Sequence, residues 1–240
     1  MKYWLSYRGY RVVATTGVDE GWARNFVDTI VDERLEPRHI FKSNARTYSA
    51  LLDVDSQAVM LKVPRSRNQR KWERFLTLFR PSEGIRTFNN LDHMQALGLN
   101  APLPLIAAEK RRFGVATDSF ACYAFEHGRP AGRDDASDIL AAMVKLHDLG
   151  YLRTDPQAAN FLVSDRGIVF IDFRLKKPLV FPRFRKRLEL AKLVRVYPSD
   201  LPYIPASVAE TATFRVARQI ELMLFQARQL KRAIRKRIAP

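Results

Sequence analysis

The stretch from Leu146 to Phe173 constrains the fold of this chain most strongly. It reads LHDLGYLRTDPQAANFLVSDRGIVFIDF. A loop aspartate, Asp155, is followed five residues later by Asn160. Two short apolar segments, at 161–163 and 168–171, then flank a polar turn and predict a small β-hairpin, directly after which comes Asp172. Two carboxylates and one amide are therefore spaced around a single predicted hairpin.

This order matches the catalytic half of the protein-kinase-like fold: an Asp, four residues, an Asn, a hairpin and an Asp-Phe pair. Phosphoryl transfer explains the spacing. One carboxylate orients the proton of an attacking hydroxyl, while an amide oxygen and a second carboxylate hold Mg²⁺ against nucleotide phosphates. By itself Asp155-Pro156 would indicate a turn or a helix N-cap, and Asp172 a strand end. The combination favours a phosphotransferase site.

A lysine on an upstream strand completes the pattern. The segment 48–63 predicts an antiparallel hairpin whose second strand carries Lys62 on the same face as Met60. The expected partner of this lysine is a glutamate of the next helix, Glu83 in the first place and Glu73 in the second. The ion pair would hold the α- and β-phosphates of a nucleotide.

Two further segments are candidates for nucleotide binding. The apolar strand 120–125 ends at Glu126, where kinase-like folds join their lobes and backbone groups receive adenine. The segment 42–47 precedes the lysine hairpin and contains no glycine. Phosphate contacts there would have to come from groups such as Ser43 and Asn44.

With these residues in view, the chain resembles the small bacterial kinases that phosphorylate the inner core of lipopolysaccharide, the heptose and Kdo kinases, and most of all the heptose II kinases. The stretches that carry the resemblance are VMLKVPR, MQALGLNAPLPL and LHDLGYLRTDPQAANFLV, within about residues 47–175. The resemblance implies transfer of the ATP γ-phosphate to a heptose hydroxyl, with Mg²⁺ as the metal. It implies Asp155 as the base, Asn160 and Asp172 as metal ligands, and Lys62 as the phosphate-binding lysine.

The chain departs from the pattern of this family at two places besides the missing glycine loop. Arg153-Thr154 stands where His-Gly usually precedes the catalytic aspartate, and Arg174 replaces the glycine after Asp-Phe.

The order of the expected elements, strands with one helix followed by helices with a small hairpin, predicts an α+β fold. The kinase-like motifs and the family resemblance imply that this fold is two-lobed, with a small β-rich N-lobe and a mostly helical C-lobe. We expect the N-lobe at 1–125 and the C-lobe at 126–240. Apolar residues recur at helical spacing between Ser82, a candidate N-cap, and Gly98, and again over 138–149. The first 39 residues are expected to add a strand at 7–15 and a helix at 24–35, and the apolar stripe of the last helix, Phe214 to Leu230, is expected to be core.

The excess of positive charge is concentrated at one end. The chain has a net charge of +16, and the segment 174–240 holds 17 Lys and Arg against 4 Asp and Glu. An anionic partner is therefore expected. The cations of 231–237 follow an amphipathic helix, which favours an anionic membrane surface or an acidic glycolipid. Nucleic acid ranks lower because the tail lacks regular aromatic interleaving.

A single cysteine, Cys122, excludes an intrachain disulfide and indicates a reducing compartment. No uncharged run is long enough to span a bilayer. We therefore expect a cytoplasmic protein, peripheral to the inner membrane. Cys122 is expected to be a core residue, and His147 to hold the catalytic loop rather than to react.

Two alternatives stay open at this stage. The acceptor of a kinase with this fold could be a protein or a small metabolite instead of a sugar. The chain could also be a catalytically inactive scaffold that binds nucleic acid or membrane through its basic surface; the missing glycine loop favours this second alternative, and the retained Asp155, Asn160, Asp172 and Lys62 oppose it.

Overall fold

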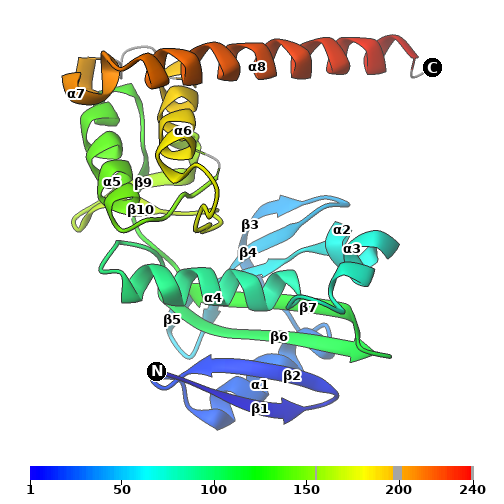
Figure 1. Cartoon of the computed structure of the whole chain (residues 1–240). Helices are drawn as coiled ribbons and strands as arrows, with labels where there is room; N and C mark the ends of the chain where they lie inside the picture. The colour runs from blue at the N-terminus through cyan, green and yellow to red at the C-terminus, as the bar shows by residue number, and fades with distance from the viewer. Residues whose placement is uncertain (155, 197–201, 239–240) are drawn as a thin grey trace. The chain divides into compact units, whose positions relative to one another are not determined.

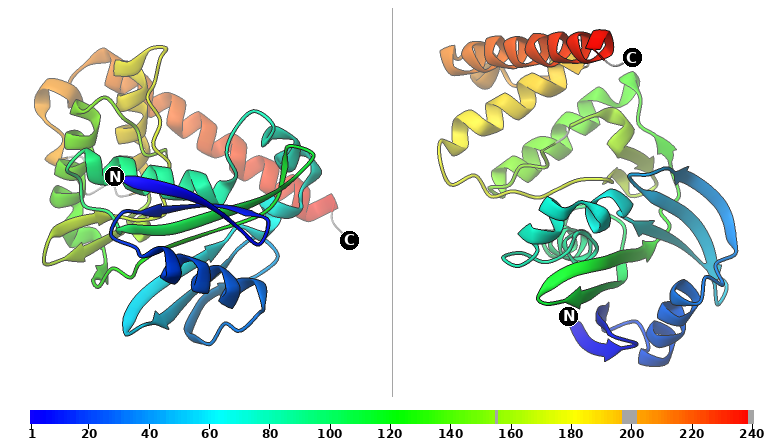
Figure 2. Two further views of the ribbon diagram at one scale, coloured as in Figure 1. Left: turned by 90° about the horizontal axis from the view of Figure 1, so that it is seen from below. Right: turned by 90° about the vertical axis from the view of Figure 1, so that its right-hand side faces the viewer.

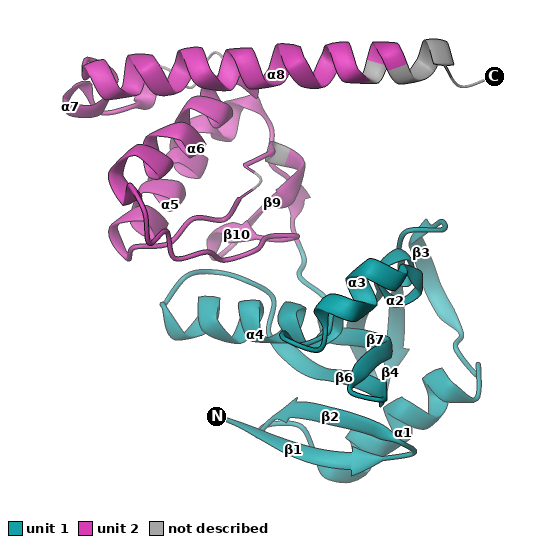
Figure 3. Ribbon diagram, turned by 45° about the vertical axis from the view of Figure 1, so that its right-hand side comes forward, with its two compact units in different colours: residues 1–127 teal, residues 128–240 magenta. Residues whose placement is uncertain are grey.

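The computed structural model describes residues 1–154, 156–196 and 202–238. The chain divides into two compact units, Met1–His127 and Gly128–Pro240 (Figure 3). This division falls two residues after the expected end of the N-lobe at residue 125. The functional meaning of the two units as kinase lobes stays a prediction.

Unit 1 is built on one antiparallel seven-stranded sheet with the order β1-β2-β6-β7-β5-β4-β3 (Figure 1). In chain order, its strands are β1 (Lys2–Tyr7), β2 (Tyr10–Thr15), β3 (Pro37–Ser43), β4 (Tyr48–Val54), β5 (Gln57–Val63), β6 (Pro104–Arg112) and β7 (Val115–Ala124). Its helices are α1 (Glu20–Val31), α2 (Arg65–Gln69), α3 (Lys71–Leu76) and α4 (Glu83–Ala96).

Helices α1 and α4 cover opposite faces of this sheet (Figure 1, Figure 2). Phe26 of α1 packs in a core cluster with Leu61 and Phe120. On the other face, Ile85 and Phe88 of α4 pack against three strand residues, Val13, Ala107 and Ala121. The buried residues of the sheet alternate between these two layers because neighbouring side chains of a strand point to opposite faces.

Unit 2 combines a small sheet with helices. The strands β8 (Arg129–Pro130), β9 (Phe161–Ser164) and β10 (Gly167–Phe170) form a three-stranded antiparallel sheet. The helices are α5 (Ala136–Asp148), α6 (Pro182–Val196), α7 (Ala206–Ala209) and α8 (Ala212–Ile238), with short 3-10 turns at Arg133–Asp135 and Ala158–Asn160. No helix in the described ranges has both the length and the apolar composition that crossing a bilayer requires.

Several predicted elements are confirmed. The hairpin of 48–63 is β4–β5, and the hairpin before Asp172 is β9–β10. Helix α4 begins after Ser82, whose side chain accepts a hydrogen bond from the backbone N–H of Ile85. Beyond its end, Gly98 has a φ of +67°, the left-handed conformation that favours glycine after a helix. Cys122 is a core residue.

Several expectations about the elements are corrected. The strand predicted at 120–125 is the end of a longer strand, β7, and its partner β6 was not expected. The helix near the N-terminus is α1, which begins and ends four residues before the predicted 24–35. The strand predicted at 7–15 is a hairpin of two strands, β1 and β2, joined by a turn at Arg8-Gly9. The basic segment 65–80, for which no element was predicted, contains α2 and α3.

A further correction concerns α8. Its apolar stripe is core only near its start, where Phe214 and Ala217 are fully buried and the helix packs on α6. Farther along, Leu224 is 47% exposed and Leu230 is 64% exposed. The stripe loses its cover because α8 extends past α6 (Figure 1).

Candidate active site

Lys62 lies near the end of β5, on the sheet face that α4 covers. In the sheet register Lys62 is directly opposite Ala121 of β7 and Ser49 of β4, and opposite residues of a register share a face. Ala121 packs against α4. The predicted phosphate-binding lysine and the helix that carries its predicted partner therefore belong to the same layer of unit 1.

The same face carries Met60, as expected from the alternation. Met60 is opposite Leu51 of β4 and Tyr123 of β7. Its sulfur lies 3.7 Å from the hydroxyl of Ser49. On this face of the sheet, the neighbours of Lys62 therefore include the polarisable side chain of Met60 and the hydroxyl of Ser49.

Glu83 is the first residue of α4, and its position is fixed by backbone packing. The next residue, Gly84, lies so close to β7 that a Cβ on it would be 2.4 Å from the carbonyl oxygen of Phe120. The Glu83 carboxylate pairs with Arg67 of α2 and, at 3.3 Å, with Arg86. Its predicted pairing with Lys62 stays a prediction.

The alternative partner, Glu73, pairs with Arg80 at 2.7 Å. This ion pair connects α3 to the segment that leads into α4. The geometry therefore gives Glu73 a role in holding the connection between the two helices.

The start of α4 is also held from β6 by a buried carboxylate. Glu109 is 2% exposed and accepts a hydrogen bond from the backbone N–H of Ser82 at 3.1 Å. Arg111 donates to both of its oxygens, at 2.8 and 3.1 Å. Burial raises the pKa of Glu109, but these hydrogen bonds outweigh that effect and leave the pKa below its ordinary value.

The β3–β4 turn, which contains Ser43 and Asn44, is held by side chains in place of glycines. The Asn44 side-chain oxygen accepts hydrogen bonds from the backbone N–H groups of Arg46 and Thr47, at 2.9 and 3.0 Å. Arg65 donates to the Ser43 hydroxyl at 3.4 Å. The backbone amides of Arg46 and Thr47 therefore already have an acceptor within the turn.

Glu126 follows the end of β7, in the segment that closes unit 1. Just before it, Phe125 donates its backbone N–H to the carbonyl of Ala58 on β5 at 3.0 Å. The Phe125 ring stacks on Phe41 of β3, with centroids 6.3 Å apart. Aromatic rings thus gather around the predicted adenine-binding segment.

In unit 2, the hairpin β9–β10 brings the two predicted metal ligands to the same end. Asn160 immediately precedes β9, and its backbone carbonyl accepts a hydrogen bond from the N–H of Ile171 at 3.0 Å. Ile171 immediately precedes Asp172. The antiparallel pairing therefore makes Asn160 and Asp172 neighbours, although eleven residues of chain lie between them.

Arg153, one of the departures from the family pattern, is fully buried beneath this hairpin. Its guanidinium lies 4.2 Å from the ring centre of Phe161. It donates to the carbonyl of Ile171 at 3.1 Å and to that of Asn160 at 3.4 Å. One buried cation thus holds the backbone next to both predicted metal ligands.

Sequence reasoning missed Glu189 of α6. Its buried carboxylate accepts hydrogen bonds from the backbone N–H groups of Thr154, at 2.6 Å, and Arg153, at 3.3 Å. His147 of α5 lies 2.9 Å from the same carboxylate, which confirms that this histidine holds the loop. The only signal in the sequence was one acidic residue, between two leucines, inside the basic run of α6.

The predicted base, Asp155, lies outside the described residues, directly after this anchored segment. The predicted ligands Asn160 and Asp172 supply hard oxygen donors, the type that Mg²⁺ prefers. No cluster of three or more His, Cys, Asp or Glu side chains suited to a metal is found among the described residues. The donor set fits Mg²⁺, which is usually bound by one or two protein oxygens together with water and phosphate.

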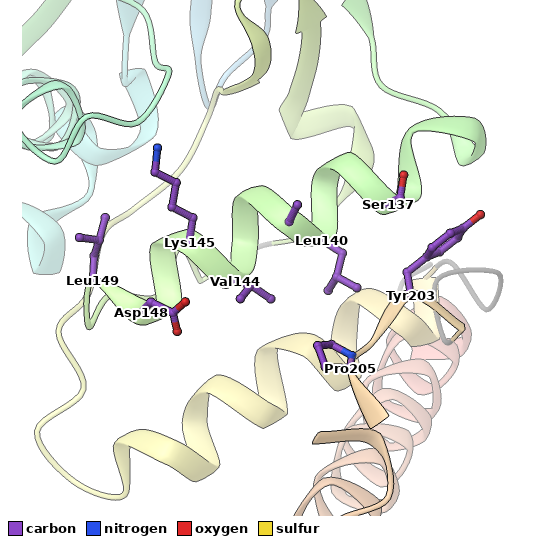
Figure 4. Close-up of a pocket in the computed structure, with 9 residues that line it drawn as sticks. Ser137, Leu140, Val144, Lys145, Asp148, Leu149, Tyr203 and Pro205 are labelled. Atoms are coloured by element: carbon purple, nitrogen blue, oxygen red, sulfur yellow. The ribbon is translucent and has the colours of Figure 1, made fainter. Parts of the chain in front are cut away.

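Unit 2 also contains an open cavity of about 560 Å³ beside α5, apart from the predicted catalytic residues (Figure 4). Its lining is mostly apolar, with Leu140 and Val144 of α5 opposite Tyr203 and Pro205. Lys145 and Asp148 add charge at its edge.

Comparison with solved structures identifies the fold. The structure described as WaaP in complex with acyl carrier protein matches with a TM-score of 0.55 and 13% identity, covering 90% of this chain and 97% of that one. The PknI kinase domain of Mycobacterium tuberculosis matches with a TM-score of 0.41 and 12% identity, over 69% of this chain and 74% of that one. The fold is α+β and protein-kinase-like, as predicted.

The family follows from sequence. The model of the lipopolysaccharide core biosynthesis protein family WaaY matches residues 5–198, and the chain belongs to this family. A search of curated proteins finds no match. Family and fold together confirm the predicted resemblance to lipopolysaccharide core kinases and make the protein a kinase.

Proposed function

We propose that this protein is an ATP- and Mg²⁺-dependent phosphotransferase that phosphorylates a hydroxyl of an inner-core sugar of lipopolysaccharide, most specifically heptose II. The observation that carries the proposal is the juxtaposition of Asn160 and Asp172, held by the Asn160–Ile171 hydrogen bond and by buried Arg153. Membership of a lipopolysaccharide core biosynthesis family supports the acceptor class.

Unit 1 would bind the nucleotide. Lys62 would neutralise the α- and β-phosphates, with Glu83 holding its ammonium group. This pairing is supported because Lys62 lies on the sheet face that α4 covers, and Glu83 is the first residue of α4. Backbone groups at Glu126 would receive adenine, and Ser43 and Asn44 would lie over the phosphates, with Asn44 shaping the turn.

Unit 2 would perform the chemistry. Asp155 would accept the proton of the sugar hydroxyl as its oxygen attacks the γ-phosphorus. The bond between that phosphorus and the bridging oxygen of ADP then breaks, so the products are a sugar phosphate and ADP. Asn160 and Asp172 would hold Mg²⁺, which when bound neutralises charge that develops on the phosphate oxygens.

Phosphate transfer from γ-labelled ATP to deacylated core oligosaccharide tests this proposal. Asp155→Asn removes the proton acceptor, and Asp172→Asn removes a ligand of the metal that stabilises the transferring group, so each is expected to lower kcat by about 1,000-fold. Asp165→Asn is the matched control, since Asp165 lies in the exposed β9–β10 turn. Undiminished transfer by the Asp155 and Asp172 variants would refute the assigned roles.

A panel of acceptors addresses the alternatives for the substrate. We expect phosphate on core oligosaccharide that contains heptose II, and none on protein or small-metabolite acceptors. Transfer to oligosaccharide truncated before heptose II would contradict the specificity for heptose II but leave the assignment as a kinase intact.

Thermal unfolding with nucleotide separates an active kinase from an inactive scaffold. ATP should raise the unfolding temperature more with Mg²⁺ than without it, because a ligand that binds only the folded state stabilises it by mass action. An unfolding temperature that changes with neither ATP nor Mg²⁺ would favour the catalytically inactive scaffold.

We also propose that the protein works at the cytoplasmic face of the inner membrane, held there by the basic C-terminal region acting on anionic lipid or on the acidic glycolipid itself. The exposed apolar and basic residues of α8 support this proposal. Nucleic acid stays the less favoured partner.

A further inference from the structure

Unit 1 exposes a group of large apolar side chains around α3 that its core does not use. We call it the aromatic patch. Its members are Trp72, 67% exposed, Phe75, 48%, Leu78, 43%, Phe79, 81%, and Phe113, 88%. The first four belong to α3 and the turn after it, and Phe113 lies at the tip of the β6–β7 turn (Figure 1).

The two parts of the aromatic patch are joined by hydrogen bonds. The Thr77 hydroxyl accepts from the backbone N–H of Ala116 at 2.8 Å. Arg111 donates to the carbonyls of Thr77 and Gly114, at 3.0 and 2.8 Å. Leu78 reaches within 3.2 Å of the Cβ position at Gly114, the neighbour of Phe113. The patch is therefore one continuous surface on a fixed support.

The rings of the patch contact one another. Trp72 stacks on Phe75 with centroids 5.7 Å apart, and Phe79 meets the edge of Phe75 at 6.0 Å. Such a cluster leaves a large apolar area in water, a feature that marks interaction sites on soluble proteins.

Four cations border the aromatic patch: Arg70, Lys71, Arg74 and Arg112. None of them has an ion pair within the part of the chain that the structure describes. The nearby carboxylates already have partners, because Glu73 pairs with Arg80 and Glu109 with Arg111. The guanidinium of Arg112 lies 5.4 Å from the centre of the Phe113 ring.

We propose that the aromatic patch inserts into the surface of an anionic lipid bilayer, with its rings at the boundary of headgroups and acyl chains and its cations at lipid phosphates. Trp and Phe bordered by Lys and Arg is the composition of interfacial membrane-binding segments. Each cation near an anionic surface contributes favourably in addition to ring burial. This site belongs to unit 1, whereas the basic C-terminal region belongs to unit 2, and the proposal does not depend on catalysis.

Charge decides between lipid and a second copy of the chain. A symmetric dimer through this surface would bring eight cations together, four from each copy, while the nearby carboxylates Glu73 and Glu109 are already paired with Arg80 and Arg111. Like charges in an interface are strongly unfavourable. In an anionic bilayer, by contrast, negatively charged lipid phosphates would lie next to these four cations.

Fluorescence quenching by vesicles of phosphatidylglycerol and phosphatidylcholine with brominated acyl chains tests the insertion. The chain has three tryptophans. We expect quenching of the wild type and loss of most of it in Trp72→Phe, which keeps an aromatic ring. Trp4→Phe is the matched control, because Trp4 is also partly exposed, at 42%, but lies on β1 outside the patch. Equal quenching in Trp72→Phe and wild type would overturn the proposal.

Vesicle co-sedimentation gives a second measurement without substrate or nucleotide, so its result is independent of the kinase proposal. Phe79→Asp and Phe113→Asp are each expected to weaken binding at least about 10-fold, since an apolar contact is replaced by a charge that lipid phosphates repel. Both side chains are exposed, so folding should be intact by circular dichroism. Unchanged vesicle binding, or concentration-dependent self-association that Phe79→Asp abolishes in place of lipid binding, would refute the insertion.

Discussion

At the scale of single residues, Glu189 does more than its position in a basic helix indicates. One buried carboxylate joins α6, α5 and the segment that leads into Asp155, through Thr154, Arg153 and His147. Because Glu189 holds the backbone of the segment just before the predicted base, its loss should affect both stability and rate.

We therefore expect Glu189→Gln to lower the free energy of unfolding by about 2 to 3 kcal/mol, because the amide directs N–H groups at backbone donors that need an acceptor. The kcat for phosphate transfer should fall by about 10- to 100-fold, with a smaller change in the KM for ATP. Glu210→Gln, at an exposed position after α7, is the control. A variant with wild-type stability and kcat would contradict this role.

Glu109 predicts a dependence of stability on pH. Its pKa is lowered in the folded protein, so its contribution is present above the pKa of the unfolded chain and is lost as the pH falls through the folded value. Wild type should lose stability below about pH 4, and Glu109→Gln should be less stable at pH 7 but lose less on acidification. Unfolding temperatures measured from pH 7 to pH 3 check this, and parallel curves for the two proteins would exclude the linkage.

At the scale of elements, the approach of α4 to β7 is the contact that sets where Glu83 lies. Gly84→Ala would place a methyl group 2.4 Å from a backbone oxygen, so the helix start must shift. We expect a loss of about 2 to 3 kcal/mol in unfolding free energy. Denaturant unfolding measures it, with Gly17→Ala as the control because nothing lies within 4 Å of a Cβ there. Equal stability of the two variants would contradict the close packing.

Elements with strong local patterns were predictable from sequence. Helix α4 has a serine cap and apolar residues on one face, and β4–β5 alternate regularly around a polar turn. Strand β6 was missed because Leu105, Ile106, Ala107 and Ala108 are all buried in the middle of the sheet, so no alternation appears. Strand β3 was missed because it is an exposed edge strand with two register shifts.

In the candidate site, too, some residues follow a sequence pattern, while others are recognised only from the tertiary structure. The sequence predicts Asp155, Asn160, Asp172 and Lys62 because their order along the chain matches the pattern that phosphoryl transfer requires, and their roles stay predictions. Arg153 and Glu189 act through tertiary contacts, and no spacing rule connects residues 153 and 189. Glu189 lies within the charged run of α6, and only its tertiary contacts, among them the one with His147 of α5, show that its side chain is buried.

At the scale of the whole molecule, exposed apolar side chains occur together with basic residues in the aromatic patch of unit 1 and in α8 of unit 2. The first is dominated by rings and the second by cations. Their responses to salt should differ, because exposed charges are screened and apolar contacts are not.

Replacing the five Lys and Arg of 231–237 with Gln is expected to weaken binding to anionic vesicles strongly, at about 1 kcal/mol per cation. The effect should shrink at high salt, whereas the effect of Phe79→Asp should persist. Co-sedimentation at two ionic strengths measures both, with vesicles of neutral lipid as the control. Equal binding of the Gln variant and wild type at low salt would refute the role of the basic end.

Because Cys122 is buried, chemical modification of its thiol measures how often unit 1 unfolds locally. This thiol is 1% exposed near the end of β7, the central strand of the sheet, and burial raises its pKa well above the ordinary value, so it reacts only when the sheet separates. Because it is the single cysteine of the chain, the rate of modification by a thiol reagent measures the opening of unit 1 alone. Nucleotide bound to that unit should slow the modification in proportion to the occupancy of its site.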